Sequence, residues 1–85
     1  MKRTISVVQT IEIEADESKF TPDFLENFNR YFHECPTVED HLAYIARSYA
    51  SGIVRSHRDF LEGYGILTEN FGVKLSCVDV TCEIE

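Results

Sequence analysis

Residues 4–15 read TISVVQTIEIEA, and this alternating stretch carries the clearest structural signal in the chain. One face of the stretch is apolar and consists of Ile5, Val7, Ile11 and Ile13. A period of two over β-branched residues is typical of a strand with one buried and one solvated face. Gln9 falls on the apolar face, so the middle of the predicted strand is weaker than its ends.

The other end of the chain, residues 73–85, reads VKLSCVDVTCEIE and predicts a second strand. Its alternation changes phase once: Val73, Leu75 and Cys77 share one face, and Val78, Val80, Cys82 and Ile84 continue the pattern one residue later. A β-bulge near Cys77–Val78 would keep both sets buried, and the alternative is that both faces of the strand's middle are covered. In a regular strand, Cys77 and Cys82 would point to opposite faces and could not bridge each other.

A first helix is predicted to begin at residues 21–23, which read TPD. They supply a hydroxyl cap, a proline at the first helical position and an acid in the positive first turn. Pro36 disfavours helical geometry in the residue before it. This helix is therefore expected to end near Glu34 or Cys35.

A second helix is predicted to begin at Thr37, which forms the pattern of a capping box with Asp40. The apolar stripe that follows keeps helical spacing as far as Tyr64. Gly52 lies inside this stripe, where it is expected to mark a bend or a close helix crossing. Residues 66–68 are compatible with a short strand followed by a turn, and the sequence does not decide whether this strand forms.

These elements predict an α+β fold in the order β-α-α-(β)-β, with a small antiparallel sheet of the N- and C-terminal strands packed against two helices. Antiparallel pairing is favoured because it places Glu83 and Glu85 near Lys2 and Arg3, whereas parallel pairing would bring acidic strand ends together. The chain shows no repeat and no internal linker. We therefore expect residues 1–85 to form a single compact domain.

Composition narrows the class of protein. The 85 residues carry a net charge of −7, so phosphates repel the chain and direct nucleic-acid binding is disfavoured. Its three cysteines lack the spacing of a disulfide framework, and no segment reads as a signal peptide or is apolar for long enough to span a bilayer. We expect a cytoplasmic protein without membrane contact.

The predicted sheet raises the question of how its edges are protected. A sheet of two or three strands has long unpaired edges, and a chain this short has a thin core. The glutamates along both strands are one device, because charge on an edge discourages pairing. Joining edges or helix faces across a two-fold axis is the other, and on this ground we expect a homodimer.

Two charged surfaces are the candidate partner-binding sites. The acidic surface lies on the first strand and the two helix starts and consists of Glu12, Glu14, Asp16, Asp23, Glu26, Glu39 and Asp40. The basic surface is a stripe on the second helix and consists of Arg47, Arg55 and Arg58. Spaced carboxylates can imitate nucleic-acid phosphates and occupy a basic groove. The helix macrodipole and ordinary solvated helix faces explain many of these charges equally well.

The residues that come closest to a metal or catalytic site are His33, Cys35 and His41. Their types suit zinc, but their spacing matches no zinc signature, and a polar turn between two helices explains them as well. Cys35 near a helix start is also a candidate nucleophile, although it continues the apolar stripe of the first helix. We expect no catalytic residue, no metal and no cofactor.

The sequence thus favours a small, acidic, non-enzymatic protein-interaction or regulatory domain. One form of this hypothesis is an inhibitor that docks on a basic, nucleic-acid-handling protein, as accessory proteins of phages and mobile elements do. Two alternatives stay open. The first is a structural homo-oligomer or assembly subunit, and the second is a small enzyme that uses Cys35 with a histidine.

Overall fold

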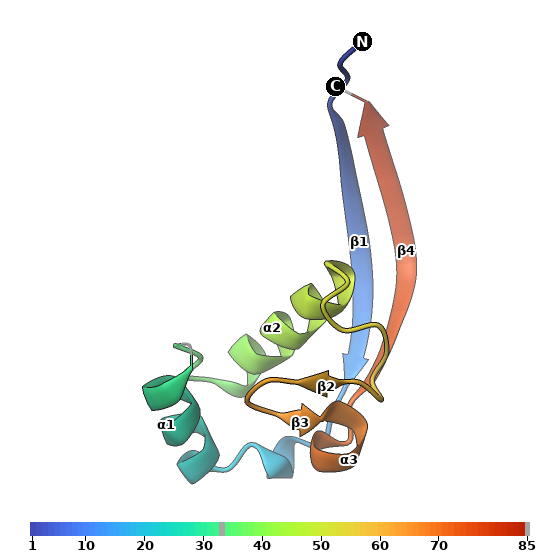
Figure 1. The fold of residues 1–85 in the computed structure, drawn as a ribbon. Coiled ribbons are helices and arrows are strands. Elements are labelled where there is room, and N and C mark those ends of the chain that lie inside the picture. Colours follow the sequence, from blue (N-terminus) through green and yellow to red (C-terminus); the bar gives the residue numbers. More distant parts are fainter. Residues whose placement is uncertain (33, 85) are drawn as a thin grey trace.

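The computed structural model describes residues 1–32 and 34–84, and it confirms the predicted α+β class (Figure 1). In chain order the elements are β1 (Ile5–Glu14), the 3-10 turn η1 (Glu17–Lys19), α1 (Pro22–Tyr31), α2 (Val38–Ala50), β2 (Phe60–Leu61), β3 (Gly65–Ile66), α3 (Leu67–Phe71) and β4 (Lys74–Ile84). β1 and β4 come from opposite ends of the chain and form a two-stranded antiparallel ribbon, as predicted. β2 and β3 form a separate short hairpin.

The charge argument gave the right strand direction but not the right contacts. Glu83 stands opposite Ser6 in the ribbon, and Glu85 lies outside the described residues. Across residues 1–32 and 34–84, the one ion pair joins Arg30 to Glu26 at 3.3 Å. The antiparallel pairing is therefore held by the backbone ladder and the apolar face, not by ion pairs at its tip.

The predicted β-bulge is present where the alternation of β4 changes phase. Thr10 pairs with Asp79 and the next residue, Ile11, pairs with Cys77, which leaves Val78 as the extra residue. An extra residue restores the alternation to the same face of the sheet. Leu75, Cys77, Val80, Cys82 and Ile84 therefore lie on one face of the ribbon, and Val78 falls outside the ladder.

The bulge also corrects the expectation for the two strand cysteines. Cys77 stands opposite Ile11 and Cys82 opposite Val7, so both lie on the same face of the ribbon. The opposite-face prediction assumed a regular strand and is wrong because the bulge falls between them. Cys35, Cys77 and Cys82 are all free thiols.

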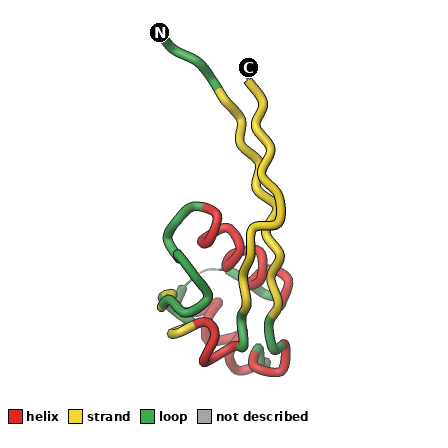
Figure 2. Tube along the Cα trace, turned by 90° about the vertical axis from the view of Figure 1, so that its right-hand side faces the viewer, coloured by secondary structure: helices red, strands yellow, loops and turns green. Residues whose placement is uncertain are grey.

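The ribbon extends far beyond the rest of the molecule, so the expected compact shape is wrong (Figures 1 and 2). The radius of gyration is 14.7 Å, against about 12 Å for a compact chain of this length. The principal extents are 50 × 23 × 19 Å. We call residues 5–9 and 80–84 the arm, and the remainder the body. In both views the arm stands clear of the helices.

The core lies in the body, where the helices and the β2–β3 hairpin meet the inner half of the ribbon. Ile45, Val54, Leu67 and Val73 are completely buried. A group of rings packs around His41, with centroids 4.7 to 5.6 Å from the imidazole: Phe20, Phe24, Phe28 and Tyr64. Aromatic packing thus supplies much of the core of this small domain.

Both predicted helix starts are confirmed. The Thr21 hydroxyl accepts a hydrogen bond from the Phe24 N–H at 3.2 Å, with Pro22 opening α1. At α2, Thr37 and Asp40 form the complete capping box, each side chain accepting the other's backbone N–H. These local devices satisfy backbone donors that the helix itself leaves unpaired.

Both helices end earlier than predicted. α1 stops at Tyr31 because the Asn29 side chain accepts the Cys35 N–H at 2.6 Å and turns the chain back. α2 stops at Ala50, not near Tyr64, because Gly52 adopts a left-handed φ of +84° just beyond it. This is the usual role of glycine after a helix. The residues that continued the stripe form a loop and the hairpin instead.

The β2–β3 hairpin was not predicted. It pairs Phe60 with Ile66 and Leu61 with Gly65. The short strand left open at residues 66–68 is therefore correct for Ile66 alone, because α3 begins at Leu67. Gly63 in the hairpin loop has a φ of +91°, which requires glycine there.

Candidate functional site

The arm carries an apolar face that nothing in the described structure covers. Residues directly opposite in the ladder share a face, so the register places five apolar side chains together: Ile5, Val7, Val80, Cys82 and Ile84. We call this set the arm face. Ile5, Val7 and Val80 are 54–55% exposed and Ile84 is 78% exposed. Exposed apolar patches of this kind on a small soluble domain mark interaction surfaces.

The arm face continues the face that the body buries. Further along the same side of the ribbon, Ile11 and Ile13 are half-buried and Leu75 is buried. α2 packs against β1 on this inner half, and the Gln9 amide donates to the Ala50 carbonyl at the end of α2 at 3.3 Å. Gln9 thus marks the boundary where the cover ends and the arm begins.

The reverse side of the arm is polar. It presents Ser6, Val8, Thr81 and Glu83, and the same side of the ribbon carries Thr10 and Asp79 directly below the arm. Val8 is its one large apolar residue and is 61% exposed. A strand pair with one apolar and one charged face is built to bury the apolar face only. The arm therefore has a defined binding side.

The predicted acidic residues are all exposed, but they do not form one site. They are Glu12, Glu14, Asp16, Asp23, Glu26, Glu39 and Asp40. Glu12 and Glu14 line a shallow hollow with Lys74 on the polar side of the ribbon, whereas the others lie at η1 and on the two helices. Among the described residues, no group of three or more acidic, histidine or cysteine side chains is placed to hold a metal.

Several of these acids have local structural roles. Asp16 caps η1, and the hydrogen bonds it accepts from the Ser18 hydroxyl and N–H lower its pKa. Asp40 closes the capping box with Thr37. Glu26 pairs with Arg30 one helical turn away. The macrodipole and capping explanation therefore accounts for much of the acidity at the helix starts.

The predicted basic stripe does not exist as a helical feature. Arg47 lies in the last turn of α2, but Arg55 and Arg58 belong to the loop between α2 and β2. The Arg55 N–H donates to the Asp59 carboxylate at 2.8 Å and closes a turn in that loop. The prediction of one stripe on a helix is wrong because it assumed that the helix continues past Gly52, whereas a partner-binding role for these arginines stays a prediction.

Cys35 and His41 lie in the core rather than in an open site. Cys35 is buried, and burial together with the charge of Asp40 raises the pKa of its thiol. His41 is completely buried, its Nδ1 lies 2.6 Å from the Tyr64 hydroxyl oxygen, and its pKa is lowered by desolvation. His33, the third residue of the group, lies outside the described residues. A buried protonated thiol is a poor nucleophile.

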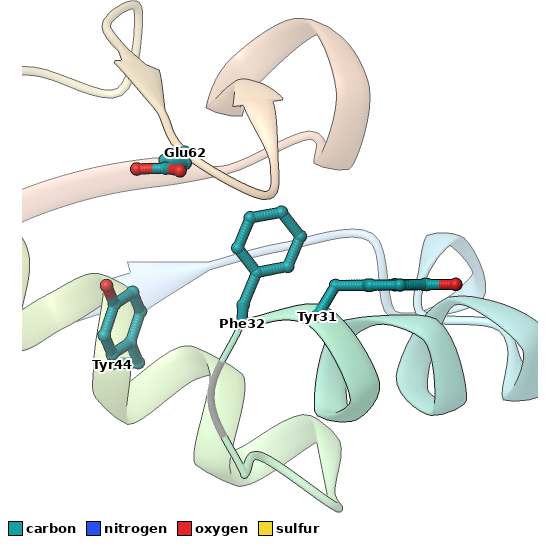
Figure 3. A pocket seen from close by; sticks show the side chains of 4 residues that line it. All are labelled: Tyr31, Phe32, Tyr44 and Glu62. Atoms are coloured by element: carbon teal, nitrogen blue, oxygen red, sulfur yellow. The ribbon is translucent and has the colours of Figure 1, made fainter.

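A shallow hollow of about 230 Å³ lies between the two main helices and the hairpin (Figure 3). It is lined by Tyr31, Phe32, Tyr44 and Glu62. Phe32 points towards the hairpin, whereas Tyr31 points away from Tyr44. The hollow brings exposed aromatic surface next to one carboxylate, without the convergent polar groups of a catalytic pocket.

Sequence reasoning did not single out the arm face, although its signal is present. The alternation of Ile5 and Val7 and of Val80, Cys82 and Ile84 is visible in the sequence. It was assigned to the core because the inner and outer halves of the ribbon carry the same pattern. An apolar residue of the ribbon belongs to the core only where a helix covers it. Whether it does depends on how far the helices extend along the ribbon.

Within residues 1–32 and 34–84, no helix has the length and apolar character needed to cross a membrane. No family model matches the chain, and neither a curated protein nor a solved structure shows significant similarity to it.

Proposed function

We propose that this chain is a small, non-enzymatic protein-interaction domain of the cytoplasm, and that the arm is its binding element. One observation carries the proposal: the arm face is apolar, exposed and separated from a polar reverse side. A chain with 15 acidic and 8 basic residues has no shortage of polar side chains. Leaving these apolar residues in water would serve no purpose for stability.

The size of the arm face suits reversible binding. A Val or Ile side chain contributes about 1.5–3 kcal/mol when it is fully buried. Ile5, Val7, Val80 and Ile84 are each more than half exposed, so covering them would contribute on the order of 5 kcal/mol per arm. Association costs roughly 4–15 kcal/mol in lost freedom of motion. The arm can therefore support binding when a partner offers a matching apolar surface of its own.

The environment of Cys35 supports the non-enzymatic assignment over the small-enzyme alternative. Its thiol is buried and its pKa is raised, whereas a catalytic thiol needs a lowered pKa and access to substrate. The odd number of cysteines, without the spacing of a disulfide framework, favours a reducing compartment.

We expect binding to depend on one side of the arm. The tagged wild-type chain, Val80→Glu and the matched control Thr81→Glu can be compared for the proteins they retain, including an untagged copy of the chain. Val80 lies on the arm face and its neighbour Thr81 on the reverse side. Retention should be lost with Val80→Glu and kept with Thr81→Glu. Equal retention by both variants would contradict the proposal.

A second function, docking on a basic nucleic-acid-handling protein, is favoured by the charge distribution. The seven acids of the predicted surface are all exposed, and one of them, Glu26, takes part in the single ion pair found across the described residues. Six of these seven carboxylates take part in no ion pair across residues 1–32 and 34–84, and such carboxylates steer association with basic surfaces. The hypothesis of an inhibitor rests on this surface and not on the arm.

Charge neutralisation tests this second function. Binding to poly-L-arginine should weaken, and its salt dependence should flatten, in the variant Glu12→Gln, Glu14→Gln, Asp23→Asn, Glu26→Gln. The control removes the same number of exposed charges elsewhere: Glu17→Gln, Glu62→Gln, Glu69→Gln, Asp79→Asn. Fluorescence titration at low and high salt measures both. If the two variants weaken binding equally, net charge alone is responsible and the surface has no specific role.

A further inference from the structure

We propose that the occupant of the arm face is a second copy of this chain, with the two arms packed face to face and antiparallel. The inference rests on the proposed function, because it names the partner of the same surface. It is argued from the continuity of the apolar face, from its self-complementary composition and from the placement of charge.

The arm face is continuous with the apolar side that the body buries, and this shows what kind of cover it requires. On the inner half of the ribbon, α2 packs against β1 and covers the side that bears Ile11 and Ile13. On the outer half the same side is open, directly beyond the end of α2 at Ala50 (Figure 1). Apolar sheet faces pack against one another about 10 Å apart. A second ribbon can therefore take, on the outer half, the place that α2 takes on the inner half.

Composition makes the arm face complementary to itself. Its five side chains are aliphatic or thiol groups, and none is charged. The one polar residue on the same side of the arm, Gln9, is uncharged and lies at the base, where it is bonded to the Ala50 carbonyl. A two-fold axis brings the same patch from both copies together, so each apolar residue meets apolar residues of the partner. The charged residues of the outer ribbon, Asp79 and Glu83, lie on the reverse side and stay in water.

Charge selects the antiparallel arrangement. Each copy carries a net charge of −7, and parallel arms would place two acidic bodies side by side. Antiparallel arms place the bodies at opposite ends, where salt screens their repulsion. With the two-fold axis at Val7, the midpoint of residues 5–9, the arm of each copy covers the arm of the other and the two bodies lie beyond opposite ends of the pair.

Size predicts a reversible dimer rather than an obligate one. The arm face offers a few hundred Å² of apolar surface per copy, below the roughly 800 Å² per partner of a standard stable interface. We therefore expect dissociation in the micromolar range, with monomer and dimer in exchange.

Two neighbouring residues of β1 give a sharp test. Val7 and Val8 are exposed to similar extents, 55% and 61%, but lie on opposite sides of the arm. Sedimentation over a wide concentration range should show a monomer–dimer equilibrium for the wild type and for Val8→Glu. Val7→Glu should weaken dimerisation by more than about 100-fold, because each copy would bury an unpaired carboxylate. Circular dichroism and the unfolding midpoint show that each variant is folded.

Charge pairing provides the second measurement. A mixture of Val7→Glu and Val7→Lys should dimerise more tightly than either variant alone, because the two-fold axis brings position 7 of both copies together. A wild type that stays monomeric at high concentration, or equal dimerisation of Val7→Glu and Val8→Glu, would overturn the inference. A monomeric wild type whose arm still retains another protein in a Val80-dependent manner would overturn this inference alone. If variants on the two sides of the arm behaved alike in every assay, the proposed function would be contradicted as well.

Discussion

Gly63→Ala is expected to destabilise the protein by about 2–5 kcal/mol, whereas Gly52→Ala should cost about 1–2 kcal/mol. Both glycines have a left-handed φ, +91° at Gly63 and +84° at Gly52. The backbone penalty of an L-residue is therefore similar at the two positions. They differ in their surroundings, and the difference isolates the effect of core packing.

A Cβ atom at Gly63 would lie 2.6 Å from Cε2 of Phe28, whereas one at Gly52 would meet nothing within 4 Å. Phe28 cannot easily give way. It is 2% exposed, and its ring packs against those of His41 and Tyr64 with centroids 4.7 and 5.0 Å away. Inserting a methyl group into such a site forces side chains off their preferred rotamers, at about 1–3 kcal/mol beyond the backbone penalty.

Urea unfolding followed by circular dichroism measures both variants against the wild type. A domain of this length has a total stability of about 4–13 kcal/mol, so Gly63→Ala removes a large fraction of it. Equal losses for the two variants would mean that the hairpin loop is free to move away from Phe28. The hairpin would then not be an integral part of the core.

Local signals in the sequence were sufficient for the strands and the helix starts. The phase change near Cys77–Val78 placed the bulge correctly, because with a period of two an extra residue is needed to keep both halves of β4 on one face. The capping residues Thr21 and Thr37 acted as predicted, because capping depends on neighbours within four positions.

Features that depend on tertiary contacts were missed. The apolar spacing after Ala50 is helical, yet Ile53 is 70% exposed and Val54 is completely buried. The spacing alone cannot show that Gly52 adopts a left-handed conformation and ends α2. Glycine is compatible with both outcomes, and the packing of Val54 in the core decides between them.

The candidate site could not be predicted for a related reason. Ile11 and Val7 belong to the same alternating pattern on the same strand, but α2 reaches the first and not the second. An early stop for α2 shortens the cover and leaves the arm face exposed. A helix that continued to Tyr64, as the spacing suggested, would instead have been expected to cover more of the ribbon. The error in helix length therefore also concealed the interaction surface.

Acid is expected to destabilise the protein through His41. The imidazole is completely buried, and desolvation lowers its pKa from the ordinary 6.5, while the backbone of Cys35 and the charge of Asp40 act in the opposite direction. As the pH falls below 6.5, the unfolded chain binds a proton at this position before the folded chain does. The free energy of unfolding therefore decreases from neutral pH down to the folded-state pKa, by about 1.4 kcal/mol for each unit of the shift.

The expected acid sensitivity has a structural cause that two substitutions can remove. Within the described residues, Nε2 of His41 has no partner at hydrogen-bonding geometry, and the Cys35 backbone and Asp40 offset only part of the desolvation. Protonation would therefore place a poorly compensated charge among the rings of the core. His41→Leu combined with Tyr64→Phe removes both members of the 2.6 Å hydrogen bond and leaves neither polar group orphaned.

Urea unfolding from pH 5 to 8 should show a clearly smaller decrease at acid pH for this double variant than for the wild type. His57→Gln, which replaces a histidine outside the buried ring cluster, is the matched control and should keep the acid sensitivity. An unchanged pH profile in the double variant would place the responsible proton elsewhere. A single His41→Leu change should lower stability at every pH, because it leaves the buried Tyr64 hydroxyl without its partner. The contrast between the single and double variants separates the proton linkage of His41 from its packing.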